Sequence, residues 1–386
     1  MVEQRVPEAE LSEALPNIRP SAHAANACLL ADGRLFVNWY AGTMEGTEDQ
    51  VIVATCSARG GWELPQVLVG RFRFGGEGWL PEIGVPVADG NRVTLYFWAV
   101  PLSGFQMGVW RGQVAWRRRI DRVHLFTTEV TGLVGCPPGA REAGGREPRL
   151  LLPEANLVLQ GSAVELPSGR WLLPAHTEGG PSASPGTRLE GVNSLRGERS
   201  AAGAGRPGEA EPPRRGRFLR SDRAGTSWEV VGDLFAEPGC LEPALTLRPD
   251  GRLLCYMRTA GAPWRIWYAE SRDEGGSWSP VLATNLRNPD SGVDVASSSS
   301  GRLLVVSNDS ERLRTPLTVG ISEDEGRTWL TRDVETGPGE FSYPKLLQTQ
   351  DGLWHLFYTH QRTHIQHLVF GEGFLAGGRQ VPGFPS

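Results

Sequence analysis

An acid, two arginines and a tyrosine fall near predicted strand ends in the C-terminal half of the chain. They are Glu242, Arg258, Arg314 and Tyr343. A guanidinium binds carboxylate groups bidentately, and a carboxylate can exchange a proton with a phenol. These residue types could together bind an anionic ligand and carry out acid–base chemistry, provided that the fold brings them to one place.

The N-terminal block adds further candidates. His23 comes just before a predicted strand, Asp49 comes just before another, and a polar loop between them carries Glu45 and Glu48. In a propeller, His23 and Asp49 could lie on the face where the strands enter the central funnel. A solvated loop would explain the two glutamates equally well, and a structural histidine would explain His23.

A repeated turn is the first sign of the fold that must position these residues. The form S-x-D-x-G-x-[ST]-W occurs at Ser271–Trp278 and Ser322–Trp329, and Ser221–Trp228 is a looser copy with Arg223 at the aspartate position. In this turn an aspartate can bond backbone N–H groups, glycine permits positive φ, and tryptophan packs between sheets. A spacing near 50 residues indicates one supersecondary unit per repeat, as in propeller blades.

Two-residue hairpin signals between apolar runs give the number of repeats, since such pairs strongly favour β-hairpins. Six occur, at Asp32-Gly33, Asp89-Gly90, Ser168-Gly169, Asp250-Gly251, Ser300-Gly301 and Asp351-Gly352. We therefore predict an all-β fold, a six-bladed β-propeller built of four-stranded antiparallel blades. Radial repetition of this kind would bring residues at similar positions of successive blades together around one axis.

Composition agrees with this fold. The 386 residues include 49 glycines, 29 prolines and 13 tryptophans, which favour short strands and many turns, and no segment has sustained helical periodicity. We expect a single domain over residues 1–386. Residues 179–216 have low complexity and almost no aromatic side chains, so we expect a flexible insertion within one blade, with a lid over the binding face as the alternative.

Charge and apolar content exclude several classes of partner. The net charge is −5, which argues against nucleic acid and anionic membranes, and no apolar run is long enough to span a bilayer. The N-terminus lacks the apolar core of a secretion signal, and five scattered cysteines favour buried thiols in a reducing compartment. We therefore expect a cytoplasmic protein, although a secreted chain trimmed of its signal would look the same.

We expect no cofactor and no metal. Three histidines cluster near the C-terminus, at His360, His364 and His367. On one extended segment, positions i and i+4 share a face but stand roughly 13 Å apart, which is too far to chelate one ion.

With these features the chain resembles the sialidases and their relatives with Asp-box (BNR) repeats, over roughly residues 23 to 367. In motif style it is closest to a bacterial and plant branch of sialidase-like proteins. The segments that carry this likeness are Trp39–Asp49, Asn288–Gly292, Ser342–Pro344 and Tyr358–Arg362. Asp boxes also occur in non-catalytic propellers, so the combination with these loops is the more specific signal.

The resemblance implies roles for particular residues. Sialic acid carries a carboxylate on its anomeric carbon, which would repel a carboxylate nucleophile, and sialidases use a tyrosine instead. By position, Tyr343 looks like that nucleophile, Glu242 like the base that activates it, and Asp49 like the acid/base for the leaving group. Arg258 and Arg314 look like two of the three arginines that bind the substrate carboxylate.

One position departs from the family pattern. Sialidases have an Arg-Ile-Pro segment ten residues before the first hairpin glycine, and His23 stands there in this chain, with Arg19 four residues out of phase. Losing a charged bidentate contact would cost on the order of 2–3 kcal/mol of binding. We include His23, Glu45 and Arg362 in the predicted substrate-binding set.

Three functions follow as hypotheses. The first is an exo-glycosidase that hydrolyses a terminal acidic sugar, which requires Tyr343 and Glu242 within hydrogen-bond reach and Asp49 across the pocket. The second is a uronate polysaccharide lyase, which requires His23 near Tyr343. The third is a carbohydrate-binding propeller without catalysis, which requires only the funnel and exposed aromatic side chains.

Overall fold

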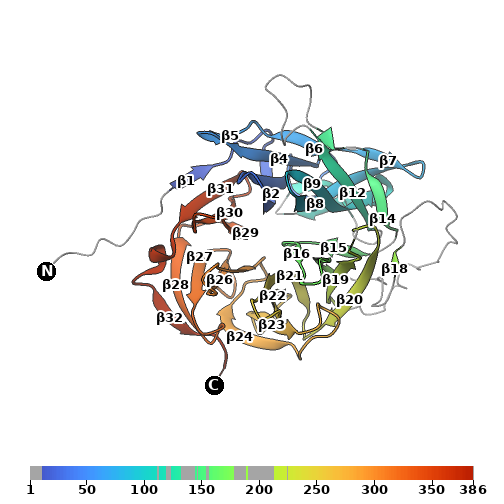
Figure 1. The fold of residues 1–386 in the computed structure, drawn as a ribbon. Coiled ribbons are helices and arrows are strands. Elements are labelled where there is room, and N and C mark those ends of the chain that lie inside the picture. Colours follow the sequence, from blue (N-terminus) through green and yellow to red (C-terminus); the bar gives the residue numbers. More distant parts are fainter. Residues whose placement is uncertain are drawn as a thin grey trace.

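The computed structural model describes residues 11–110, 113–118, 123–131, 144–145, 147–153, 156–177, 188–189, 213–223 and 225–385. Among them there is no α-helix, and the helical elements are the 3₁₀ turns η1 (Leu102–Gly104) and η2 (Glu372–Leu375). Figure 1 shows the strands gathered into sheets that form a ring around a central axis. The prediction of an all-β, six-bladed propeller is confirmed.

Six antiparallel sheets form the blades, which we number 1 to 6 in chain order. Blade 1 contains β2 (Ser21–Leu29), β3 (Leu35–Gly42), β4 (Val51–Ala58), β5 (Gly61–Trp62) and β6 (Gln66–Val69). Blade 2 contains β7 (Phe72–Phe74), β8 (Glu77–Asp89), β9 (Arg92–Pro101), β12 (His124–Thr131), β13 (Gly144–Gly145) and β14 (Arg149–Leu152). Blade 3 contains β15 (Leu157–Leu159), β16 (Val164–Glu165), β17 (Trp171–Thr177), β18 (Arg188–Leu189), β19 (Gly216–Ser221) and β20 (Trp228–Leu234).

The C-terminal blades are more regular. Blade 4 contains β21 (Cys240–Leu247), β22 (Leu253–Thr259), β23 (Arg265–Ser271) and β24 (Leu282–Arg287). Blade 5 contains β25 (Asp294–Ser297), β26 (Leu303–Asn308), β27 (Leu317–Ser322), β28 (Thr328–Glu335) and β32 (Arg379–Pro382). Blade 6 contains β29 (Phe341–Gln348), β30 (Trp354–His360), β31 (His364–Phe370) and β1 (Leu11–Ala14). A separate hairpin is formed by β10 (Phe105–Trp110) and β11 (Gln113–Arg118).

Both ends of the described chain are tied into the ring. The N-terminal strand β1 pairs with β31 and so supplies the fourth strand of the last blade. The C-terminal strand β32 pairs with β28 at the outer edge of blade 5. Strands β2, β8, β15, β21 and β29 lie toward the centre of the ring (Figure 1).

The predicted hairpins join the inner strands to their neighbours. The six hairpin glycines all have positive φ, with values between 63° and 86°. Glycine adopts such angles without steric cost, which explains why this residue recurs at each tight turn.

The repeated turns are held by their aspartates. Asp273 accepts hydrogen bonds from the backbone N–H (2.8 Å) and the hydroxyl (2.7 Å) of Ser277. Asp324 accepts the equivalent two bonds from Thr328, at the same distances. In the looser copy, Asp222 binds the backbone N–H and hydroxyl of Thr226 at 2.8 and 2.7 Å. In that copy the aspartate therefore stands one residue closer to the N-terminus, and Arg223 does not interrupt the turn.

The tryptophans that end these turns pack against aromatic side chains of the preceding blade. The ring-centroid distances are 5.0 Å for Trp228 and Tyr96, 4.7 Å for Trp278 and Phe218, and 6.2 Å for Trp329 and Tyr256. Each contact joins two neighbouring blades, because the two rings belong to successive blades, with Trp278 in the connection between β23 and β24.

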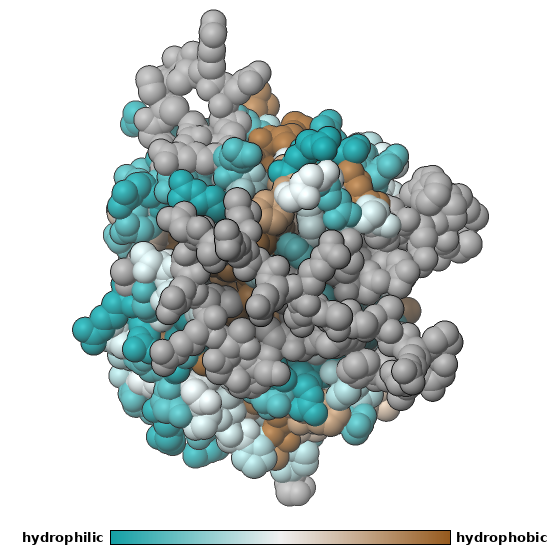
Figure 2. All heavy atoms as spheres, turned by 90° about the vertical axis from the view of Figure 1, so that its right-hand side faces the viewer, coloured by the Kyte–Doolittle hydropathy of each residue, from teal (hydrophilic) through white to brown (hydrophobic). Residues whose placement is uncertain are grey.

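The surface has no dominant character on the side that Figure 2 shows, where hydrophilic and hydrophobic residues are intermixed over the coloured part. No helix among the described residues is long and apolar enough to cross a bilayer. The predicted insertion at 179–216 lies mostly outside the described residues, and within it β18 pairs with β20. Four of the five cysteines are described, and their thiols are free, whereas Cys136 lies outside the described residues.

Candidate active site

Three inner strands combine a shift in pairing register with a positive φ at the residue that follows. Pairing with the next strand shifts register after His23 in β2, after Leu241 in β21 and after Ser342 in β29. The following residues, Ala24, Glu242 and Tyr343, have positive φ of 54°, 46° and 52°. A bulge of this kind redirects a side chain, so the side chains of blades 4 and 6 can meet at the axis.

Tyr343, Glu242 and Arg258 form a closed set of hydrogen bonds. The Tyr343 hydroxyl donates to Glu242 Oε1 over 3.0 Å. Arg258 Nη1 donates both to Glu242 Oε1, over 2.6 Å, and to the Tyr343 oxygen, over 2.9 Å. Burial and the Glu242 carboxylate raise the pKa of Tyr343 to about 12. The phenol is therefore protonated at neutral pH, with its proton directed at the carboxylate.

The second predicted arginine also faces the tyrosine. The Arg314 guanidinium carbon lies 5.4 Å from the centre of the Tyr343 ring. Arg314 Nη1 donates to Glu340 Oε1 over 2.8 Å, while Arg258 Nε donates to Asp290 Oδ1 over 2.6 Å. Each arginine is thus paired with a carboxylate of the chain.

Arg362 connects this region to blade 1. Its Nε donates to Glu340 Oε2 over 2.9 Å, and its Nη1 forms an ion pair with Glu45. The exposed fractions of the Arg362, Glu340 and Glu45 side chains are small, so solvent screens these pairs only weakly. The Arg362–Glu45 pair holds the polar loop of blade 1 against blade 6.

His23 lies beneath these charges and is 1 % exposed. Its ring packs edge-on against Tyr343, with centroids 4.4 Å apart, and against Tyr40, with centroids 5.4 Å apart. Neither ring nitrogen has a hydrogen-bond partner among the described residues. Burial and the nearby Arg362 guanidinium hold the pKa of His23 well below its usual value, so the ring is neutral.

Asp49 is placed differently from the other candidates. Its side chain is exposed, and it accepts hydrogen bonds from the Thr43 backbone N–H (2.9 Å), the Thr43 hydroxyl (2.7 Å) and the Thr47 hydroxyl (2.6 Å). Partial burial acts to raise the pKa of Asp49, but these hydrogen bonds outweigh it and lower the pKa. None of the hydrogen bonds found for Asp49 among the described residues reaches Tyr343 or Glu242.

Two carboxylates of the site were not assigned from the sequence. Glu340 bridges Arg314 and Arg362, and Asp290 pairs with Arg258. Asp290 belongs to the segment Asn288–Gly292, which the resemblance singled out without a role for this residue. Glu340 stands three residues before Tyr343. The one sequence feature that could have pointed to it is its position as a charged residue beside a predicted inner strand.

The expected geometry of the C-terminal histidines was wrong. His360 and His364 do not lie on one extended segment, because a hairpin turn separates β30 from β31 and pairs the two residues directly. Their rings stack with centroids 4.6 Å apart. Among the described residues, no group of three or more His, Cys, Asp or Glu side chains is arranged to hold a metal ion.

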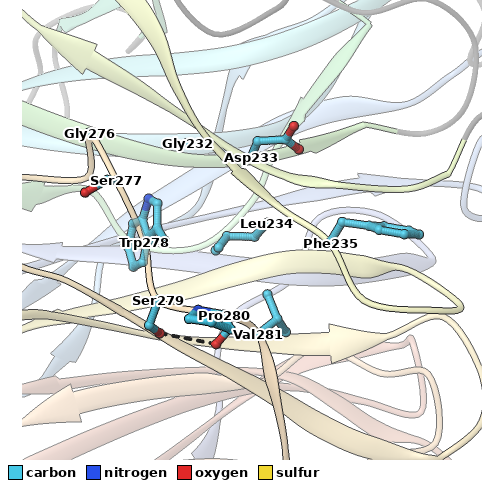
Figure 3. A pocket seen from close by; sticks show the side chains of 10 residues that line it. All are labelled: Gly232, Asp233, Leu234, Phe235, Gly276, Ser277, Trp278, Ser279, Pro280 and Val281. Carbon is cyan, nitrogen blue, oxygen red and sulfur yellow. Dashed lines mark hydrogen bonds between the residues drawn. The ribbon is translucent and has the colours of Figure 1, made fainter.

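Two surface grooves lie away from this cluster. One groove of about 490 Å³ runs between blades 3 and 4, with Trp278 and Phe235 at its two sides (Figure 3). Another, of about 480 Å³, lies between β1 and blade 1 and includes Trp62 and His367. Neither groove contains the tyrosine, the glutamate or the arginines of the cluster.

Comparisons with known proteins agree with the fold. Residues 33–356 match the family described as BNR repeat-like domain. Among solved structures, a Hadza microbial sialidase, Hz136, is 13 % identical with a TM-score of 0.67, and the match covers 96 % of this chain and 71 % of that one. The NanB sialidase of Streptococcus pneumoniae, as the K499G mutant, is 12 % identical with a TM-score of 0.63, covering 92 % and 69 % of the two chains.

A third structure, the sialidase of Trypanosoma rangeli, is 15 % identical with a TM-score of 0.63, and the match covers 93 % of this chain and 56 % of that one. No curated protein sequence matches the chain. Sequence identities this low are evidence for a shared fold only, whereas the match to the family spans most of the sequence. The chain therefore belongs to the BNR repeat-like domain family and has the six-bladed propeller fold that sialidases share.

Proposed function

We propose that the protein is an exo-glycosidase of the sialidase type that hydrolyses a terminal acidic sugar. The observation that carries this proposal is the hydrogen bond from the Tyr343 hydroxyl to Glu242 Oε1, with Arg258 in contact with both. A buried phenol with a raised pKa is a poor nucleophile unless a base takes its proton, and Glu242 is placed to do so. Arg258 and Arg314, which both contact Tyr343, would bind the carboxylate of the sugar.

The reaction is a double displacement. The Tyr343 oxygen bonds to the anomeric carbon as the glycosidic C–O bond breaks, and the phenolic proton passes to Glu242. The leaving oxygen takes a proton from a general acid, for which Asp49 is our candidate. Water then displaces the tyrosine oxygen, losing a proton to the same acid/base, and Tyr343 recovers its proton from Glu242.

The assignment of Asp49 carries a structural requirement. In the present arrangement this carboxylate accepts three hydrogen bonds within its own loop, which favour its ionised form. Proton donation therefore requires bound substrate to replace the bonds from Thr43 and Thr47. The ion pair of Arg362 with Glu45 of the same loop would keep that loop beside the sugar during the exchange.

The lyase hypothesis has one observation in its favour, the contact between the His23 and Tyr343 rings. Elimination needs a base that reaches a carbon-bound proton of the sugar. His23 is 1 % exposed and packs edge-on against the tyrosine ring, so it could act only through Tyr343. The geometry therefore favours hydrolysis.

The deciding experiment is turnover of a fluorogenic sialic-acid glycoside by the wild type and by Tyr343→Phe. We expect turnover that is lost in the variant by a factor on the order of 10³ or more, because the nucleophile is removed. Phenylalanine keeps the contacts with His23 and Arg314, so the melting temperature should change little. Unsaturated products from a uronate polysaccharide would support the lyase, and sugar binding without turnover of any glycoside would support a binding propeller.

A further inference from the structure

A small, largely enclosed cavity lies on the propeller axis behind the reactive pair. Its wall includes Asn26, Gln160, Glu242, Tyr343 and Lys345, which come from the inner segments of blades 1, 3, 4 and 6. The volume open to the centre of a water molecule is about 10 Å³. This is close to the smallest space that holds one water.

Four polar atoms of the cavity wall have no hydrogen-bond partner among the described residues. They are the acceptors Glu242 Oε2, Asn26 Oδ1 and Gln160 Oε1, and the donor Lys345 Nζ. All four side chains belong to residues that are less than 9 % exposed. Lys345 Nζ lies 3.0 Å from Asp294 Oδ2, so its charge is paired while its other N–H groups remain available. Buried polar groups in folded proteins are nearly always bonded to protein or to ordered water.

We propose that this cavity binds one ordered water molecule, which joins Lys345 to Glu242. A cation would be repelled by the Lys345 ammonium, and an anion by the Glu242 carboxylate and the amide oxygens. Water satisfies both sides, because it accepts from Lys345 Nζ and donates to Glu242 Oε2 and to one amide oxygen.

The site gives Lys345 a role in the reaction, and this part rests on the proposed function. Glu242 Oε1 receives the proton of Tyr343, while Oε2 is held from behind by the water. The water therefore fixes the rotation of the carboxylate before the reaction. Lys345 is a positioning residue for Glu242, and it does not touch the substrate.

The water itself is tested without any assay of activity. A high-resolution crystal structure of the full chain should show one solvent peak within hydrogen-bond distance of both Glu242 Oε2 and Lys345 Nζ. Absence of a peak, or a direct bond between Lys345 and Glu242, would overturn the proposal. A bound inorganic ion, identified by its anomalous signal and contact distances, would overturn it as well.

The positioning role is tested with the double variant Lys345→Met/Asp294→Asn. The pair is removed together because a single substitution would leave a buried charge without a partner. Asparagine retains the acceptor for the Leu346 backbone N–H. We expect kcat to fall about tenfold with little change in KM, because Glu242 would lose the contact that fixes its rotation while the substrate-binding arginines keep theirs.

The matched control removes the ion pair between Arg252 and Asp250, which lies in the hairpin that follows the Glu242 strand. Arg252→Met/Asp250→Asn should leave kcat and KM unchanged. A wild-type kcat in the Lys345 double variant, or an equal fall of kcat in the control, would refute the positioning role. Failure of the proposed function would look different, because the wild type itself would show no turnover while the crystallographic result would still stand.

Discussion

The variant His23→Arg would introduce the arginine of the sialidase pattern at a position that is buried in this structure. We expect a less stable protein and no gain in the binding of an acidic sugar. The His23 ring is 1 % exposed and packs against Tyr40 and Tyr343. A guanidinium there would lie beside Arg362, and the nearest carboxylates already pair with Arg362.

The expected loss of stability follows from the cost of a buried charge without a partner, about 3–5 kcal/mol. The entropy of unfolding is about 2.1 cal/mol/K per residue near the midpoint, which for 386 residues gives about 0.8 kcal/mol/K. The melting temperature of His23→Arg should therefore fall by about 4–6 °C.

The measurement is a thermal melt of the wild type, His23→Arg and the control His23→Phe. Phenylalanine keeps the ring contacts and removes two nitrogens that have no partner among the described residues, so its melting temperature should stay within about 1–2 °C of the wild type. A His23→Arg protein with an unchanged melting temperature and faster turnover of a sialic-acid glycoside would refute this reasoning. It would show that the site opens to accept the family arginine.

Two further predictions concern the cluster and the seam between the first and last blades. A methyl group at Gly292 would lie 3.2 Å from Tyr343 Cδ1 and 3.3 Å from Glu242 Oε2. Gly292→Ala should therefore lower kcat about tenfold, whereas the control Gly337→Ala should leave kcat unchanged. Equal values of kcat for the two variants would contradict this prediction. Burial lowers the pKa of His367, which faces Glu13, His355, Trp62 and Phe357. The pKa of His367 in the folded protein lies below the unfolded value of about 6.5, so below that pH the unfolded chain binds a proton that the folded protein does not. The contribution of His367 to the free energy of unfolding is therefore complete above a pH of about 6.5 and is lost as pH falls, by about 1.4 kcal/mol per pH unit. Denaturation between pH 7 and 5 should therefore show a shallower loss of stability for His367→Asn than for the wild type, and identical slopes would exclude this role.

The fold could be predicted because its signals are local. Each blade contains a two-residue hairpin turn with glycine, which only a few sequences can form, and all six glycines adopt the positive φ that the turn needs. The resemblance also fixed the positions of Tyr343 and Glu242 relative to those turns, and in the structure the two side chains are in contact. Radial repetition then brings residues about 100 positions apart within 3.0 Å of each other.

The remaining features depend on contacts between blades, which a single sequence does not reveal. The sequence assigned no role to Glu340 or Asp290. Their pairing with Arg314 and Arg258 becomes visible only when the blades are assembled into the ring. The stacking of His360 on His364 was missed for another reason. The turn between them contains Gln361 and Arg362 with φ of 53° and 57°, angles that usually require glycine or asparagine. A hairpin without its usual residues gives no local signal.

The backbone at Glu242 and Tyr343 links the fold to the proposed chemistry. A non-glycine residue with φ near 50° costs roughly 1–2 kcal/mol, and both residues adopt such angles. At the corresponding break of blade 3 the chain has Gly161, whose φ of 105° carries no such cost. Glycine would thus suit the bulge itself, yet Glu242 and Tyr343 keep the strained conformation, as does Ala24 at the same place in blade 1. At Glu242 and Tyr343 the strain lies where the two side chains meet in the candidate site, which agrees with the clustering of strained residues at functional sites.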